Sequence, residues 1–117
     1  MENVADLSVV PKPPLQPCVV VDLLGELDVA SMPELRRYLT TLISSGSVRL
    51  VLNAACLDFI DAVGIGSLVQ AANLARAGGG WVRLIGVKPR HRRLLLILRL
   101  SGQLPMHENL HEALRGQ

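Results

Sequence analysis

The chain has 117 residues, of which half are apolar and only 19% are charged. This length and composition predict a single domain over residues 1–117, with its core at about residues 7–114, and exclude a disordered or low-complexity chain. The longest uninterrupted apolar stretch, residues 94–98, is far shorter than the roughly 20 residues of a membrane span, so we expect no membrane association and a cytoplasmic location.

The overall charge of +2 conceals a difference between the two halves of the chain. Up to Asp61 there are eight acidic and four basic side chains, net −4, and from Ala62 onward there are eight basic and two acidic ones, net +6. Such a distribution favours oriented binding to a protein partner. One Phe, one Tyr and one Trp leave little surface on which bases could stack, so we expect no nucleic-acid partner.

The first half of the chain predicts two strands, a helix and a third strand. Residues 7–10 and 18–24 are β-type runs separated by a proline cluster at positions 11, 13, 14 and 17, and residues 48–52 form a further apolar run. Ser31-Met32-Pro33-Glu34 predicts a capping box that starts a helix ending near Ser44. The predicted inward face of this helix consists of Leu35, Leu39, Leu42 and Ile43.

The second half predicts alternating helices and strands. We expect helices over residues 62–77, 89–100 and 107–114, and strands over residues 81–87 and 104–106. The first of these helices ends at Gly78-Gly79-Gly80, and the second begins at Pro89. The resulting order, ββαβαβαβα, predicts an α/β domain with helices on a mostly parallel sheet.

Acidic side chains follow two of the predicted strands. Asp61 begins the 62–77 helix, where an aspartate stabilises the exposed N–H groups as an N-cap. Parallel strands end at one edge, so Glu26, Asp28, Asp58 and Asp61 are expected to share a rim. The ordinary interpretation of the rim is helix capping and solvated loops, and the functional interpretation is a docking surface or a magnesium site.

Several motifs together carry a family resemblance. Gly25-Glu26-Leu27-Asp28 and Phe59-Ile60-Asp61-Ala62-Val63-Gly64-Ile65-Gly66 are followed by Gly79-Gly80 and by a segment from Pro89 through Arg93-Leu94 to Ser101-Gly102. From about Leu7 to Leu114 the chain closely resembles the STAS domains of bacterial anti-sigma factor antagonists. The resemblance implies a non-catalytic switch protein without a cofactor. Such a protein binds an anti-sigma factor, usually a GHKL-type serine kinase, and so frees a sigma factor for transcription.

The contact surface is expected at the start of the 62–77 helix and the neighbouring loop. It comprises Asp28, Asp58, Phe59, Asp61, Ala62, Val63, Gly64, Ile65 and Gly66. In the family this helix begins with serines or threonines that the kinase phosphorylates, whereas the matching positions here are Ala62 and Val63, which have no hydroxyl. We therefore expect no phosphoswitch at these positions. Ser67 is expected to bond to the helix backbone or to face solvent rather than to act as a displaced target.

The two cysteines are expected to lie too far apart for a disulfide, since Cys18 starts one strand and Cys56 follows its neighbour. Cys56, near the rim, is the one candidate for redox control, although a reduced, inert thiol is the ordinary expectation. His107-Glu108-Asn109-Leu110-His111 matches the zinc motif H-E-x-x-H. Its position at a helix start, near the end of the chain and without a third ligand, argues against a metal site.

The basic helix at residues 89–100 carries a second expectation. Leu94, Ile97 and Leu98 are assigned to its inward face, and the continuous apolar run leaves Leu95 or Leu96 exposed as a partner or weak self-association patch. Two alternatives to the antagonist role remain at this point. One is a scaffold or sensor subunit of a stress-signalling assembly, and the other is a small module that binds a ligand or divalent metal.

Overall fold

The computed structural model describes residues 8–12 and 18–115, which form a five-stranded sheet in the order β1-β2-β3-β4-β5. β1 (Ser8–Lys12) pairs antiparallel with β2 (Cys18–Leu27), and the remaining neighbours are parallel. They are β3 (Arg49–Ile60), β4 (Trp81–Ile85) and β5 (Met106–His107). The predicted order ββαβαβαβα and the mostly parallel sheet are confirmed.

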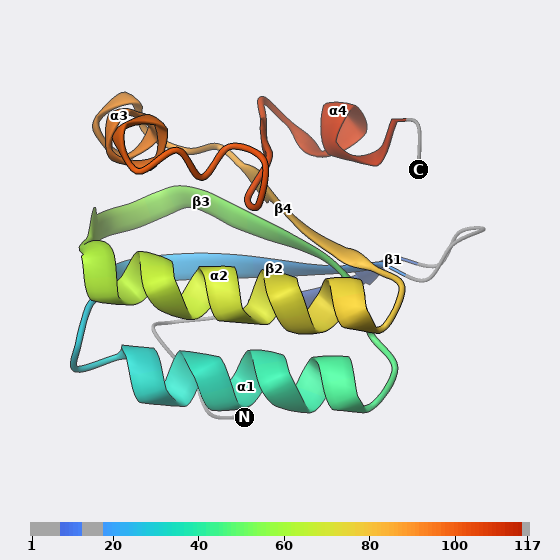
Figure 1. Cartoon of the computed structure of the whole chain (residues 1–117). Coiled ribbons are helices and arrows are strands. Elements are labelled where there is room, and N and C mark those ends of the chain that lie inside the picture. Colours follow the sequence, from blue (N-terminus) through green and yellow to red (C-terminus); the bar gives the residue numbers. More distant parts are fainter. Residues whose placement is uncertain (1–7, 13–17, 116–117) are drawn as a thin grey trace.

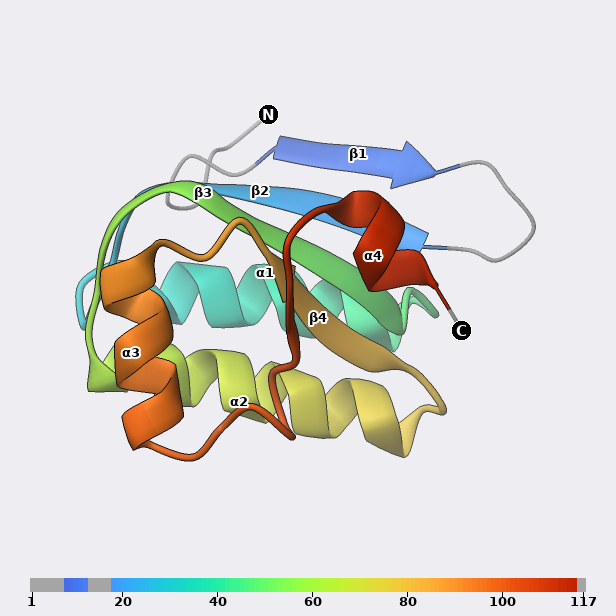
Figure 2. The same cartoon turned by 90° about the horizontal axis from the view of Figure 1, so that it is seen from above.

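The helices cover the two faces of the sheet in pairs. α1 (Met32–Ser44) and α2 (Ala62–Ala77) lie on one face, and α3 (Pro89–Ile97) and α4 (Leu110–Leu114) lie on the other (Figures 1 and 2). The main core includes the inward side chains of α1 and α2, among them Leu35, Leu39, Ile65 and Leu68, which are at most 1% exposed. Full burial of one such side chain contributes about 1.5–3 kcal/mol to stability.

A smaller apolar cluster lies under α4. Cys18, Val20, Val51, Ile85 and Ala113 are buried there, with Trp81, Leu110 and Leu114 packed against them. The guanidinium of Arg83 stacks 3.8 Å from the centre of the Trp81 ring and donates a hydrogen bond to the Ala113 carbonyl oxygen. These contacts hold the short terminal helix against the sheet, because five residues alone are too few to form a stable helix.

β3 is much longer than the five residues predicted. It continues to Ile60 because residues 53–60 go on pairing with β2 through two register shifts, and because Leu57 and Ile60 enter the core. β2 likewise passes through Gly25, whose φ of +92° is easily adopted without a side chain. Because β2 and β3 are long, the residues of the predicted contact surface lie at one end of the sheet.

Other boundaries also differ from the prediction. β4 ends at Ile85, α3 ends at Ile97, β5 covers only residues 106–107 and α4 begins at Leu110, so each is shorter than predicted. Pro11 was predicted to lie in the turn but lies within β1, opposite Val19. Leu7 and the prolines at 13, 14 and 17 lie outside the described residues, as do the outer limits of the predicted domain.

The predicted capping box at the start of α1 is wrong. Ser31 has helical backbone angles and its side chain caps no helix N–H group. Its hydroxyl instead donates to the Glu26 carbonyl oxygen at 2.8 Å and accepts from the Asp28 amide at 3.1 Å. Asp28 Oδ1 accepts the amides of Ala30 and Ser31, so the loop is closed by an Asx-type turn.

Candidate functional site

The end of β3 and the first turn of α2 are fixed by Asp61. Its backbone is extended, and its Oδ1 accepts a hydrogen bond from the Gly64 amide at 2.9 Å, which confirms the predicted N-cap. The Asp61 amide donates to the Leu27 carbonyl oxygen at 3.2 Å. The start of α2 is therefore joined to the end of β2 as well as to β3.

The two glycines of the first turns of α2 have different surroundings. A Cβ atom on Gly64 would lie 2.6 Å from the Leu27 carbonyl oxygen and 2.7 Å from Leu27 Cγ, whereas a Cβ on Gly66 would meet nothing within 4 Å. Gly64 thus permits a close approach within the chain rather than to a partner. Gly66 is exposed and open to solvent.

The nine predicted contact residues divide by burial. Asp58, Phe59, Ala62, Val63 and Gly66 are exposed, Asp28 and Asp61 are half-buried, and Gly64 and Ile65 are buried. The two buried residues support the surface from below and present no side chain to a partner. Phe59 and Val63 are the large apolar side chains of this surface, at 46% and 44% exposure.

Val29 is an exposed apolar residue that the sequence analysis missed. It lies in the loop between β2 and α1, directly after Asp28, and is 65% exposed. This loop, the end of β3 and the first turn of α2 lie at the same end of the molecule (Figure 1). The sequence could have indicated this residue as a contact candidate, because an apolar side chain is unusual in a turn of small and acidic residues.

The acidic rim is not a cluster of carboxylates alone. Lys88 Nζ lies 3.6 Å from Asp58 Oδ1, and the guanidinium of Arg90 donates to the Asp58 carbonyl oxygen at 2.8 Å. The start of α3 therefore reaches over the end of β3. Within residues 8–12 and 18–115, no three His, Cys, Asp or Glu side chains are grouped so that they could hold a metal ion, and the magnesium interpretation receives no support.

α3 rests on the sheet through His91 and Leu95, both buried. His91 lines a cavity of about 10 Å³ together with apolar residues such as Leu57 and Leu95, and its Nδ1 has no hydrogen-bond partner. Burial lowers the pKa of His91, and the nearby charges of Arg90 and Lys88 lower it further. The neutral imidazole is the form that this environment favours.

The exposed side of α3 differs from the prediction. Ile97 and Leu98 were assigned to the inward face but are 68% and 41% exposed. Leu94 is half-buried as part of the core, and Leu95 is buried, which leaves Leu96 as the exposed member of the predicted Leu95/Leu96 pair. The apolar run has no periodicity of its own, so the contact of His91 with the sheet decides which residues face outward.

The Ser67 hydroxyl is bonded as expected, whereas Cys56, which was expected to follow the third strand, lies within β3 because that strand extends to Ile60. Ser67 is buried and its hydroxyl donates to the Gly64 carbonyl oxygen at 2.7 Å, which confirms bonding to the helix backbone. Cys56 is an exposed free thiol opposite Leu24, six residues along β2 from the buried Cys18. That spacing corresponds to about 20 Å, so no disulfide can join the two cysteines.

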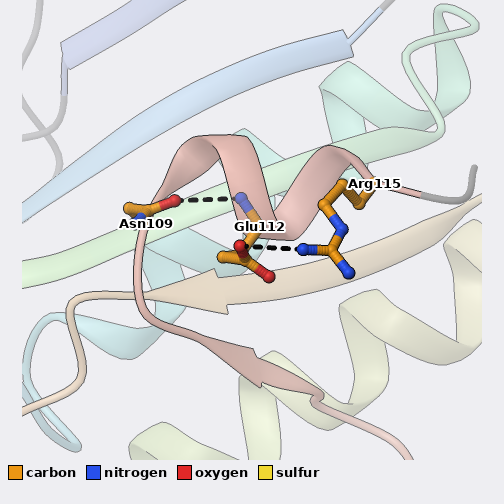
Figure 3. Close-up of polar contacts among 3 residues, drawn as sticks. All are labelled: Asn109, Glu112 and Arg115. Carbon is orange, nitrogen blue, oxygen red and sulfur yellow. Dashed lines mark hydrogen bonds and ion pairs between the residues drawn. The ribbon is translucent and has the colours of Figure 1, made fainter.

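The H-E-x-x-H sequence does not form a zinc site. His107 ends β5, whereas His111 lies in α4, so the two histidines do not share one helix. Figure 3 shows what holds this region instead: Asn109 Oδ1 accepts the Glu112 amide as an N-cap, and Glu112 pairs with Arg115 at 3.1 Å. An open pocket of about 440 Å³ adjoins these residues and is also lined by Arg92 and His107.

The fold and the site define the class of protein. A sheet with one antiparallel edge strand, four parallel strands and paired helices on each face matches the solved structure of the anti-sigma factor antagonist SpoIIAA in its unphosphorylated form. The match has a TM-score of 0.68 at 23% identity and covers 90% of this chain and 92% of that one. An anti-sigma factor antagonist from Mycobacterium paratuberculosis matches with a TM-score of 0.77 at 20% identity, covering 94% and 92%.

The family model of the STAS domain matches residues 10–113, so the chain belongs to the STAS domain family. Among curated proteins it is similar to the anti-sigma-B factor antagonist of Staphylococcus aureus, at 29% identity over 84 residues. This alignment covers 72% of the present chain and 78% of that protein. In the part of the chain that the structure describes, no helix is both long and apolar enough to cross a membrane.

Proposed function

We propose that this protein is an anti-sigma factor antagonist that binds an anti-sigma factor in the cytoplasm and thereby frees a sigma factor for transcription. The observation that carries the proposal is the exposed surface of Phe59, Ala62 and Val63 around the Asp61-capped start of α2. Curated relatives named as antagonists support the same role. Binding rather than catalysis is the proposed output.

The proposed partner is an anti-sigma factor that is itself a GHKL-type serine kinase, as the family resemblance implies. Ala62 and Val63 offer such a kinase no hydroxyl, and the Ser67 hydroxyl is buried and bonded to Gly64. A phosphate on this surface would add nearly two negative charges beside Asp58 and Asp61. Since no acceptor is present at positions 62 and 63, the proposed antagonist stays competent to bind whether or not the kinase has ATP.

The first test is a pull-down from lysate of the source cells in ATP–magnesium and in ADP, with partners identified by mass spectrometry. Recovery of a GHKL-type anti-sigma factor in both nucleotide states is the expected result. Recovery in ADP alone would contradict the proposed lack of switching, and intact-mass analysis would then locate any phosphate. Absence of an anti-sigma factor in both states would contradict the antagonist role.

The surface is tested with the recovered anti-sigma factor by titration calorimetry. Phe59→Asp and Val63→Asp should each weaken binding by about tenfold or more, because a carboxylate would replace an apolar contact. Leu74→Asp is the matched control, since Leu74 is equally exposed at 46% but lies farther along α2. Equal effects of all three substitutions would rule out the proposed surface.

A further inference from the structure

Exposed apolar side chains are concentrated at one end of the molecule. Among residues 18–115, seven large apolar side chains are exposed. Six of them belong to the β2–α1 loop, to the junction of β3 with α2, and to the C-terminal end of α3 with the residue that follows it. Both views place these segments at the end of the molecule where β3 finishes (Figures 1 and 2). The six are Val29, Phe59, Val63, Leu96, Ile97 and Leu98. A patch of this kind on a folded domain marks an interaction surface.

The α3 part of this patch is basic. Arg93 is exposed and precedes Ile97 by one helical turn, so both lie on the outer side of the helix. Arg92 is also exposed, but it lines the pocket beside Glu108 and Glu112. The sequence contains no Asp or Glu between Asp61 and Glu108, so α3 itself carries no acidic side chain. Neither arginine takes part in an ion pair between described residues.

The remainder of the patch is acidic. Glu26 is exposed and pairs in register with Phe59 across β2 and β3, and Glu34 is exposed in the first turn of α1. The basic α3 segment and this acidic segment meet where Lys88 and Arg90, at the start of α3, contact Asp58 at the end of β3. A two-fold interface requires a patch of this self-complementary kind, because each half must contact the opposite half of the other copy.

We propose that this end of the molecule binds a second copy of the chain, in a two-fold dimer in which α3 of each copy faces the Glu26–Phe59 segment of the other. Ile97 and Leu96 then lose water contact against Phe59, and Arg93 approaches Glu26. The arrangement with two α3 helices facing each other is disfavoured, since it would bring arginines of both copies together. Opposite charges set the pairing, and the apolar side chains supply the buried contact.

The dimer would cover Phe59, so self-association would compete with the anti-sigma factor for the same surface. This consequence for regulation rests on the proposed function, whereas the dimer itself does not. At high concentration of the free antagonist, part of it would be dimeric and would bind the anti-sigma factor only after the dimer dissociates. The two proposals are separable because self-association is measured on the purified chain without a partner.

The test is sedimentation velocity of the purified full chain over a wide concentration range at low and high salt. The wild type should show a monomer–dimer equilibrium whose dissociation constant increases with salt. Arg93→Glu and Glu26→Lys should each weaken the dimer by about tenfold or more, because each creates two like-charge contacts. An equal mixture of these two variants should associate again, since the reversed charges then face each other.

Ile97→Asp should also abolish the dimer, while Leu74→Asp, the same kind of change outside the patch, should not. Circular dichroism on every variant verifies that the fold is retained. A wild type that is monomeric at every concentration, or a mixture that fails to recover association, would overturn the proposal. Binding of a monomeric wild type to phosphatidylglycerol vesicles would assign the patch to an anionic lipid surface and would overturn it as well.

Discussion

At the scale of single residues, Gly64 and Gly66 show how two identical residues in one helix can have opposite roles. Gly64 is buried and lies so near Leu27 that no side chain fits, whereas Gly66 faces open space. Both glycines belong to the predicted contact surface, because a glycine in a helix gives no indication of which face it occupies. Only the contact between β2 and α2 distinguishes them.

Alanine substitutions at these two positions should change stability in opposite directions. Gly64→Ala places a methyl group against the Leu27 carbonyl and should lower the free energy of unfolding by about 1–3 kcal/mol. Gly66→Ala should raise it by about 0.5–1 kcal/mol, because alanine loses less conformational entropy in a helix. Urea denaturation measures both values, and a destabilised Gly66→Ala would contradict the assignment.

The Asp61 cap predicts a graded loss of stability. Asp61→Ala removes the acceptor for the Gly64 amide and should cost about 1 kcal/mol, while Asp61→Asn should retain most of the stability because the amide oxygen accepts the same bond. Asp58→Ala is the control, since the exposed pair with Lys88 contributes only about 0–1 kcal/mol. Equal losses for Asp61→Asn and Asp61→Ala in chemical denaturation would refute the cap.

At the scale of elements, α3 depends on a buried histidine. The helix contacts the sheet through His91 and Leu95, although the sequence favoured a face formed by Leu94, Ile97 and Leu98. Because five successive residues are apolar, the sequence pattern does not indicate which face of the helix is buried. The contact of His91 with the sheet sets the rotation of α3 instead, and the contacts of Lys88 and Arg90 with Asp58 hold the start of the helix.

Burial of His91 predicts a pH dependence of stability. The folded chain binds a proton on His91 only below the lowered pKa, whereas the unfolded chain binds it near the ordinary pKa of about 6.5. The unfolded state therefore binds more protons between these two values, and stability should fall as the pH decreases from about 6.5 to the lowered pKa. Thermal unfolding at about pH 7.5 and about pH 5.5 measures this loss.

Two variants assign the pH dependence to His91. His91→Leu removes the titrating group and should flatten the decrease of the melting temperature below about pH 6.5. His111→Gln changes an exposed histidine of α4 and should leave the wild-type slope in place. An unchanged slope in His91→Leu would show that another group is responsible.

At the scale of the whole molecule, the packing of α4 on the sheet separates the two cysteines in reactivity. Cys18 is buried in the cluster under α4, while Cys56 is exposed on β3. In the native protein, dithionitrobenzoate should react rapidly with one of the two thiols and with the second only on unfolding. Cys56→Ser should eliminate the rapid phase, and a rapid phase that persists in this variant would contradict the described burial of Cys18.

The sequence by itself determined the element order, the parallel α/β class and the Asp61 N-cap, because these depend on local signals: apolar runs, glycine and proline positions, and a carboxylate before a helix. It also determined that positions 62 and 63 carry no hydroxyl. The extension of β3 to Ile60 was not predictable, since residues 53–60 contain polar and small side chains and are held as a strand by pairing with β2. Pairing of this kind is a non-local interaction.

Tertiary structure alone decided how the predicted residues are presented. It buried Gly64 and Ile65, exposed Val29, rotated Ile97 and Leu98 outward, and placed Lys88 and Arg90 beside Asp58. It also placed the two histidines of H-E-x-x-H in different elements, the first in β5 and the second in α4. The physical reason is that exposure and proximity depend on how elements pack against one another, whereas residue type and spacing describe each element only along its own axis.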